Sequence, residues 1–160
     1  MTTMEELPRE IKAFVNMYAW RRNDPVPWTA PSKPLSESRV GLIVMACMTA
    51  PDQPPFHAEE PDFDASMRVV SSDIDPGTLV NTWSGQAFDH AGLQSDANLL
   101  IPLDRLREMK AAGEIGDIAP RTVSLCGHLP KPQQFIDETA PAIARLFAED
   151  GADVVLLVPA

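Results

Sequence analysis

The stretch Val40-Gly-Leu-Ile-Val-Met-Ala-Cys47 decides the fold, because it is apolar on both of its alternating faces. A strand of this kind suits a parallel sheet that is covered by helices on both sides. Two later segments show the same apolar character, Arg121–Gly127 and Asp153–Val158. We therefore predict that these three segments are the core strands of one sheet.

Two amphipathic segments alternate with these strands. Residues 102–113 begin with a proline, which is well tolerated in the first turn of a helix, and end in Gly113. Residues 133–150 carry apolar side chains at helical spacing and are followed by Gly151. From residue 101 the predicted order is helix, strand, helix, strand, which indicates an α/β fold with a mostly parallel sheet and helices on both faces, in three layers. The arrangement is flavodoxin-like or Rossmann-like, but no glycine-rich phosphate loop follows any strand, so the sequence has no nucleotide motif.

The rest of the chain surrounds this predicted core. We expect one α/β domain over 1–160, with an N-terminal helix and an extended arm in 1–38 and the core in 39–160. The helix follows from an apolar stripe in residues 5–18. The 16 prolines predict long loops, and residues 49–100 are expected to form a long, ordered, proline-rich loop. Within it, the segments Met67–Val70 and Thr78–Trp83 could pair as a small hairpin.

Composition excludes several classes of protein. The formal net charge of −10 argues against sequence-independent binding to nucleic acid, which requires cations to neutralise phosphates. The longest apolar run, Val40–Met48, is far shorter than the ~20 residues of a membrane-spanning helix. Two cysteines cannot build a disulfide framework, so we expect a cytoplasmic protein. Residues 40–100 hold nine acidic side chains and one basic side chain, Arg68.

Three candidate residues follow from the expected sheet. Ligands of open α/β sheets bind beyond the carboxyl ends of the strands. Cys47 and Cys126 stand at the ends of two predicted strands, and His128 follows shortly after the second. These residues are candidates for substrate binding or, for Cys126, for catalysis. The alternative for each cysteine is a small buried apolar side chain.

Other candidates lie in predicted loops. In Phe88-Asp89-His90 the carboxylate could orient the imidazole, which makes Asp89 and His90 candidate acid–base groups and Phe88 a substrate contact. The alternative is a pair that stabilises its own loop. Arg21, in the pair Arg21-Arg22, could clamp a carboxylate, or it could simply be solvated at a helix end.

No metal site is predicted, because no cysteine or histidine pair has the spacing of metal ligands. A metal-binding domain that uses these residues from separate loops remains a third interpretation, after an enzyme and a binding module.

Several strings resemble one known family when they are taken together. They run from about residue 15 to the end of the chain: Tyr18-Ala-Trp-Arg-Arg-Asn-Asp-Pro-Val-Pro-Trp28, Lys33-Pro-Leu-Ser-Glu-Ser-Arg-Val-Gly-Leu-Ile43, Gln53-Pro-Pro-Phe56, Phe88-Asp-His90, Asn98-Leu-Leu-Ile-Pro-Leu-Asp-Arg-Leu-Arg-Glu108, Gly113-Glu-Ile-Gly116, Glu138-Thr-Ala-Pro-Ala-Ile-Ala-Arg145 and Gly151-Ala-Asp-Val-Val-Leu-Leu-Val-Pro-Ala160. The chain resembles the selenoprotein B family of glycine, sarcosine, betaine and D-proline reductases, in its short bacterial form.

The resemblance implies a selenol- or thiol-dependent reductase that cleaves a C–N bond of a small amino-acid-like substrate. It implies a selenocysteine or cysteine nucleophile just after Ala160, and a selenol of low pKa is anionic and polarizable at neutral pH. It also implies a partner reductase subunit or a thioredoxin-like reductant, and no bound cofactor besides the selenocysteine. We accordingly expect the printed chain to be the N-terminal part of a longer protein that is interrupted at a recoded TGA codon, and a homo-oligomer is one expectation for its assembly.

The alternative function is a non-catalytic small-molecule-binding or assembly subunit. In that interpretation the acidic residues of 49–100 would hold a cationic molecule or dock a basic partner.

Overall fold

The computed structural model describes residues 4–17, 23–57, 64–82, 90–127, 129 and 132–159. The chain divides into two compact units, Met1–Ala30 and Pro31–Ala160. The first unit contains a short 3-10 helix, Met4–Glu6, and helix α1, Arg9–Met17. The predicted N-terminal helix is therefore present, but none of the residues of α1 is buried.

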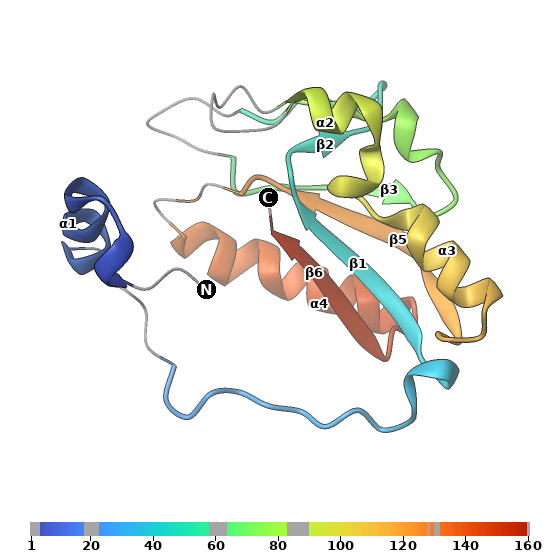
Figure 1. The fold of residues 1–160 in the computed structure, drawn as a ribbon. Coiled ribbons are helices and arrows are strands. Elements are labelled where there is room, and N and C mark those ends of the chain that lie inside the picture. The colour runs from blue at the N-terminus through green and yellow to red at the C-terminus, as the bar shows by residue number, and fades with distance from the viewer. Residues whose placement is uncertain are drawn as a thin grey trace. The chain divides into compact units, whose positions relative to one another are not determined.

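The second unit is built on a four-stranded sheet in the order β3-β5-β1-β6 (Figure 1). Its strands are β1 (Arg39–Met45), β3 (Met67–Ser71), β5 (Asp117–Leu125) and β6 (Val154–Pro159). Strand β1 lies between β5 and β6 and is parallel to both, while β3 is antiparallel to β5 at one edge. The predicted α/β class with a mostly parallel sheet is confirmed, and the three predicted core strands are its parallel members.

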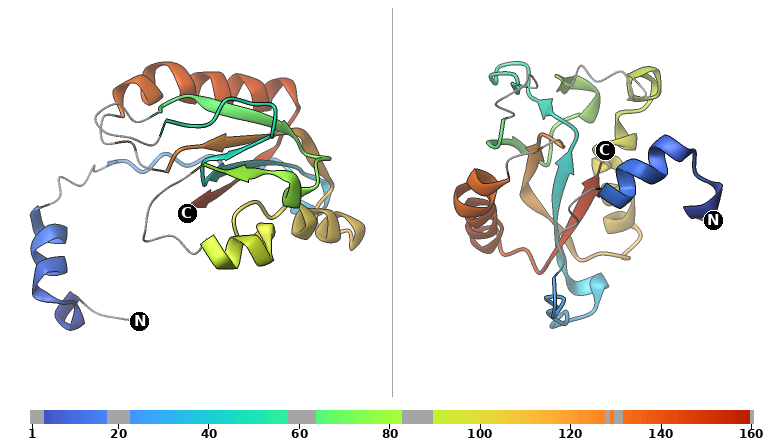
Figure 2. Two further views of the ribbon diagram at one scale, coloured as in Figure 1. Left: turned by 90° about the horizontal axis from the view of Figure 1, so that it is seen from above. Right: turned by 90° about the vertical axis from the view of Figure 1, so that its left-hand side faces the viewer.

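Each face of the sheet carries its own apolar core. On one face, Val40, Leu42 and Val44 of β1 pack with Leu103 and Leu106 of helix α3 (Leu103–Ala111). Alternate side chains of a strand point to opposite faces, so Ile43 belongs to the second core. There it lies among residues of helix α4 (Ala140–Glu149). Figure 2 shows α3 and α4 on opposite sides of the sheet.

Helix α4 lies very close to the central strand. A Cβ atom built on Gly41 of β1 would stand 2.7 Å from two ring carbons of Phe147. Phe147 is a buried member of the second core. The absence of a side chain at position 41 therefore permits the close packing of α4 on β1.

The predicted starts and ends of the helices agree with their backbone geometry. Pro102 stands at the N-terminal boundary of α3, and Gly113 follows the helix with a φ of +74°. Gly151 follows α4 with a φ of +65°. This left-handed conformation is costly for residues with a Cβ, so glycine ends both helices at little cost. A π-helical turn, Phe135–Thr139, precedes α4.

Residues 49–100 contain several regular elements. A second, two-stranded sheet pairs β2 (Met48–Thr49) with β4 (Val80–Asn81). Helix α2 (His90–Ser95) and two 3-10 helices, Pro76–Thr78 and Ala97–Leu99, complete this part of the fold.

The predicted hairpin between Met67–Val70 and the segment at Thr78 is wrong. Strand β3 instead pairs with β5, with Met67 opposite Leu125 and Ser71 opposite Arg121. A two-stranded hairpin is marginal by itself in water, whereas joining a sheet that is already packed buries Val70. Trp83 lies outside the described residues.

None of the helices in the described ranges combines the length and the apolar character that crossing a membrane requires.

Candidate functional site

The two cysteines meet at the carboxyl edge of the parallel strands. Cys47 follows β1 and Cys126 directly follows β5, and the backbone N–H of Cys47 donates a 2.9 Å hydrogen bond to the carbonyl of Leu125. Both cysteines are 1% exposed, and together with Phe56 they form a small buried cluster. Both cysteines are in the thiol form, and no disulfide joins them.

The two thiols interact directly. A hydrogen bond between the side chains of Cys47 and Cys126 is the main reason why the pKa of Cys47 is raised, and burial adds to it. The backbone N–H of Gly127 acts in the opposite direction, because it stabilises the thiolate. At neutral pH the thiol of Cys47 is therefore held protonated, and a protonated thiol is a weak nucleophile.

The backbone of Cys47 has an unusual conformation. Its φ is +49°, which is rare for a residue with a Cβ and costs on the order of 1 kcal/mol. Its carbonyl accepts two 3.0 Å hydrogen bonds, one from the backbone N–H and one from the hydroxyl of Thr82. These contacts hold the conformation, and they carry the chain from β1 of the large sheet to β2 of the small one.

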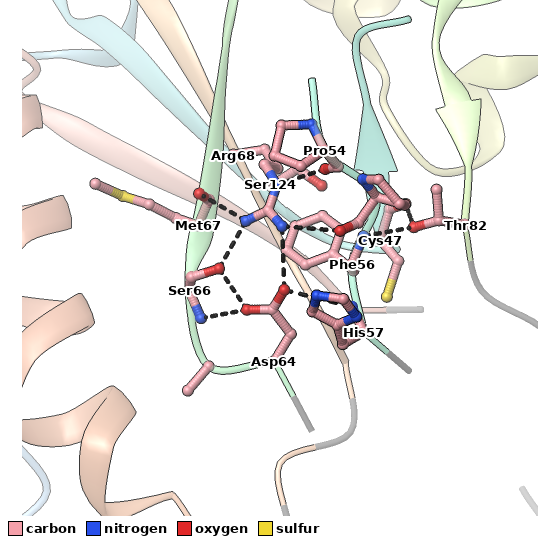
Figure 3. A network of polar contacts seen from close by, with 12 residues as sticks. Cys47, Pro54, Phe56, His57, Asp64, Ser66, Met67, Arg68, Thr82 and Ser124 are labelled. Atoms are coloured by element: carbon pink, nitrogen blue, oxygen red, sulfur yellow. Dashed lines mark hydrogen bonds and ion pairs between the residues drawn. The ribbon is translucent and has the colours of Figure 1, made fainter. Parts of the chain in front are cut away.

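Phe56 covers the thiols and is itself covered by Arg68. The guanidinium carbon of Arg68 lies 4.2 Å from the centroid of the Phe56 ring, a cation–π contact (Figure 3). Arg68 Nε donates to the carbonyl of Pro54 at 2.9 Å, and Nη2 donates to that of Pro55 at 3.1 Å. One side chain of β3 thus fixes both the ring of Phe56 and the backbone that leads to it.

A carboxylate completes this arrangement. Asp64 lies 3.1 Å from Arg68 in an ion pair whose side chains are only 9% and 11% exposed. Burial by itself would raise the pKa of Asp64. Hydrogen bonds from the hydroxyl and the backbone N–H of Ser66 act against burial, as do the backbone N–H of His57 and the charge of Arg68. Together they outweigh it, so the pKa of Asp64 is lowered. Asp64 is therefore ionised at neutral pH and keeps Arg68 in place.

Beside the small sheet lies a cavity of about 620 Å³. Its wall includes Met48, Asn81 and the carboxylates Asp75, Asp96 and Asp104. Each carboxylate has local partners: Asp75 accepts from the backbone N–H of Gly77, and Asp96 and Asp104 both accept from Asn98. The hydrogen bonds from Asn98 are the main reason why the pKa values of Asp96 and Asp104 are lowered. The cavity wall is therefore negatively charged at neutral pH.

The structure brings together only part of the set of residues proposed from the sequence. Cys47 and Cys126 are adjacent. His90 is the first residue of α2, and residues of the same helix line the acidic cavity, although the side chain of His90 is outside the described part. Four candidates lie outside the described residues: Arg21, Phe88, Asp89 and His128. Their roles stay predictions.

Sequence reasoning missed Phe56, Asp64 and Arg68 as members of the site. A signal for one of them was present, because Arg68 is the only lysine or arginine in 40–100 and has nine acidic residues in that stretch as possible partners. Nothing local to Phe56 or Asp64 indicated that they would join the cysteines. In the part of the chain that the structure describes, no group of three or more potential ligands is placed to hold a metal ion.

The structure thus places two buried thiols at the carboxyl edge of an α/β sheet, the edge at which open sheets of this class bind their ligands. Comparison with known proteins identifies the family: residues 9–160 match the model of glycine/sarcosine/betaine reductase selenoprotein B. The chain belongs to this family, which associates it with reductases in the broad sense.

One relative is a D-proline reductase subunit gamma from Acetoanaerobium sticklandii, which is 29% identical over 133 residues. The match covers 83% of this chain and 53% of the relative, so the chain spans about half the length of the curated relative that it matches. The name of the relative marks it as one subunit of a larger reductase. No solved structure matches the chain significantly.

Proposed function

We propose that the chain is the N-terminal part of a selenol- or thiol-dependent reductase component that acts on a small amino-acid-like substrate. The nucleophile, a selenocysteine or cysteine, follows Ala160. It attacks the carbon that bears the nitrogen, and the electrons of the C–N bond leave with the nitrogen, which takes up a proton. A second thiol then attacks the selenium or sulfur of this adduct, and the carbon leaves with the electron pair of the broken bond and takes up a proton. Overall, a C–N bond is replaced by a C–H bond and a dithiol is oxidised to a disulfide.

The observation that carries this proposal is the register of β6 on β1. Val158 pairs with Val44, and Pro159 pairs with Met45. Because β6 runs parallel to β1, a residue that follows Ala160 would lie at the carboxyl edge of the sheet. Open α/β folds place their ligands at this edge, and the two cysteines follow β1 and β5 at the same edge.

Two partner proteins are also proposed, a reductase subunit and a reductant. A partner reductase subunit would present or activate the substrate, and a thioredoxin-like protein in a reducing cytoplasm would return the electrons. No bound cofactor besides the selenocysteine is required for this chemistry. His90 and Asp89 remain the proposed acid–base pair, which would give the departing nitrogen its proton.

The test begins with the gene. The codon after Ala160 should be TGA, followed by an open frame that encodes further cysteines. The full frame should release amine from glycine, betaine or D-proline in the presence of its partner subunits and a dithiol. Alanine at the position after Ala160 should abolish that release. Turnover by the printed 160 residues with dithiol alone would contradict the proposal, and so would a frame that closes directly after Ala160 in the gene.

The acidic cavity favours a second candidate function, the binding of a cationic small molecule by a non-catalytic subunit. Its wall carries three carboxylates and no described basic side chain. Titration calorimetry with tetramethylammonium at low ionic strength tests it. Asp96→Asn should weaken binding and Asp52→Asn, outside the cavity wall, should not; equal heats in the two variants would rule this function out.

A further inference from the structure

We propose that Cys47 and Cys126 form a dithiol/disulfide couple, a redox site enclosed by Phe56 and Arg68. This site stands on its own geometry and does not depend on a nucleophile after Ala160. A small disulfide or azo compound oxidises the couple, and a dithiol reduces it again.

Three features of the structure support the couple. The side chains of Cys47 and Cys126 belong to one small buried cluster, so the two thiols are neighbours in the folded chain. The backbones are held side by side, because Cys47 N–H donates to the carbonyl of the residue before Cys126. Cys47 also has a strained backbone, and such strain is typical of functional positions.

The reaction balances in two exchange steps. The thiolate of one cysteine attacks a sulfur of the oxidant R–S–S–R, a mixed disulfide forms, and the first RS⁻ departs. The second cysteine then attacks the mixed disulfide, which releases the second RS⁻ and closes the bond between Cys47 and Cys126. Two protein thiols lose their hydrogens and two electrons, and one disulfide becomes two thiols. With diamide the two hydrogens pass to the N=N bond.

Enclosure decides the rate of this reaction. Phe56 and the two cysteines are almost completely buried. An oxidant therefore reaches the thiols only when Phe56 moves away from them. Arg68 restrains Phe56 through the cation–π contact with its ring and through hydrogen bonds to the carbonyls of Pro54 and Pro55. We infer that Arg68 is the positioning residue that keeps the couple reduced and slow to react.

The first experiment oxidises the folded chain with diamide and then alkylates it in denaturant. Peptide mapping by mass spectrometry should show one intramolecular Cys47–Cys126 disulfide, which dithiothreitol reverses. Oxidation should be faster at pH 9 than at pH 7, since the thiolate is the attacking species. Cys47→Ser and Cys126→Ser should each give no intramolecular product.

A second measurement does not rely on a variant that folds. Phenylarsine oxide bridges two adjacent thiols with the loss of one water, and it should bind the wild-type chain in a ratio of one to one. This adduct should resist monothiols and yield to a dithiol. The proposal would be overturned if the folded protein gave only intermolecular disulfides. It would also be overturned if the chain formed the disulfide and bound the arsenical only after unfolding in urea.

The role of Arg68 has its own test. Arg68→Met should speed diamide oxidation at least tenfold while the product stays the same. Arg105→Met is the matched control, because Arg105 forms an exposed ion pair with Glu108 on helix α3, and it should leave the rate unchanged. Equal oxidation rates in the two variants would contradict the positioning role of Arg68.

Discussion

The guanidinium of Arg68 lies over the ring of Phe56, 4.2 Å from its centroid, and Phe56 in turn packs on both cysteines. The cation belongs to β3, an edge strand that runs antiparallel to its neighbour. Because β3 runs in the opposite direction, its first residues stand at the edge where the parallel strands end. An antiparallel edge strand thus places Arg68, and Asp64 just before the strand, at the carboxyl edge of the parallel strands.

The ion pair of Arg68 and Asp64 should matter strongly for stability. Arg68→Met leaves the carboxylate of Asp64 buried without its cation, which costs about 3 kcal/mol of unfolding free energy. Urea unfolding followed by circular dichroism measures the loss. Arg105→Met, which breaks an exposed pair, should cost less than about 0.5 kcal/mol. Similar losses in the two variants would show that the buried pair contributes no more than a surface pair.

The close packing of α4 on β1 predicts a strong effect of a single methyl group. Gly41→Ala places a Cβ 2.7 Å from the ring of Phe147, so the helix or the ring must shift. We expect a loss of about 2 kcal/mol, typical of an overpacked core. At Gly77 a Cβ meets its nearest atom only at 3.3 Å, on the side chain of Asp75, so Gly77→Ala should be much milder. Thermal unfolding of the two variants compares them, and a Gly41→Ala protein as stable as wild type would contradict this view of the interface.

Asp117 predicts a pH dependence of stability. It accepts a 2.6 Å hydrogen bond from Lys110 and pairs with Arg39 at 3.0 Å, and the contact with Lys110 is the main cause that lowers its pKa to about 2. A carboxyl whose pKa is lower in the folded state stabilises the fold above its unfolded pKa, roughly 3.9, and loses that effect as the pH falls through the folded value.

Asp117→Asn should therefore lower stability by up to about 1 kcal/mol at pH 7, because the partly exposed pair is screened by solvent. The difference from wild type should shrink between pH 4 and pH 2. Urea unfolding at a series of pH values measures it. A difference that stays constant down to pH 2 would mean that the charge of Asp117 contributes nothing.

Strand β6 predicts self-association of the chain. It is an edge strand, and Val155, Leu156 and Leu157 on it are 41%, 40% and 63% exposed. An apolar edge with open hydrogen-bonding groups tends to pair with another chain. Sedimentation should show concentration-dependent association that Leu157→Lys reduces. Thr78→Lys, at an exposed position outside the large sheet, is the control, and equal association in both variants would exclude β6 as the contact.

The predictability of this fold differed between its parts. The strand at Val40–Cys47 and the helices after Pro102 and before Gly151 were predictable, because their apolar periodicity and their terminating residues are local signals. The partner of β3 was not, since short strands carry no local signal for which edge they will join. Pairing of β3 with β5 depends on the sheet that surrounds it.

The site divides in the same way. The meeting of Cys47 and Cys126 was foreseeable, because the carboxyl ends of parallel strands share an edge and both residues come shortly after such strands. The contribution of Phe56 and Asp64 was not foreseeable, because it arises from a loop that returns to the sheet and from one arginine that holds it. Tertiary hydrogen bonds to the Pro54 and Pro55 carbonyls are invisible in the sequence.

Cys47 is also a hinge point of the architecture, because the chain leaves the large sheet before it and enters the small sheet directly after it. Its neighbour Met48 is the first residue of β2 and lines the acidic cavity, and Asn81, which pairs with Met48 from β4, lines the same cavity. The buried thiol of Cys47 therefore stands one residue away from the wall of the acidic cavity, so the thiol pair and the cavity share one stretch of backbone.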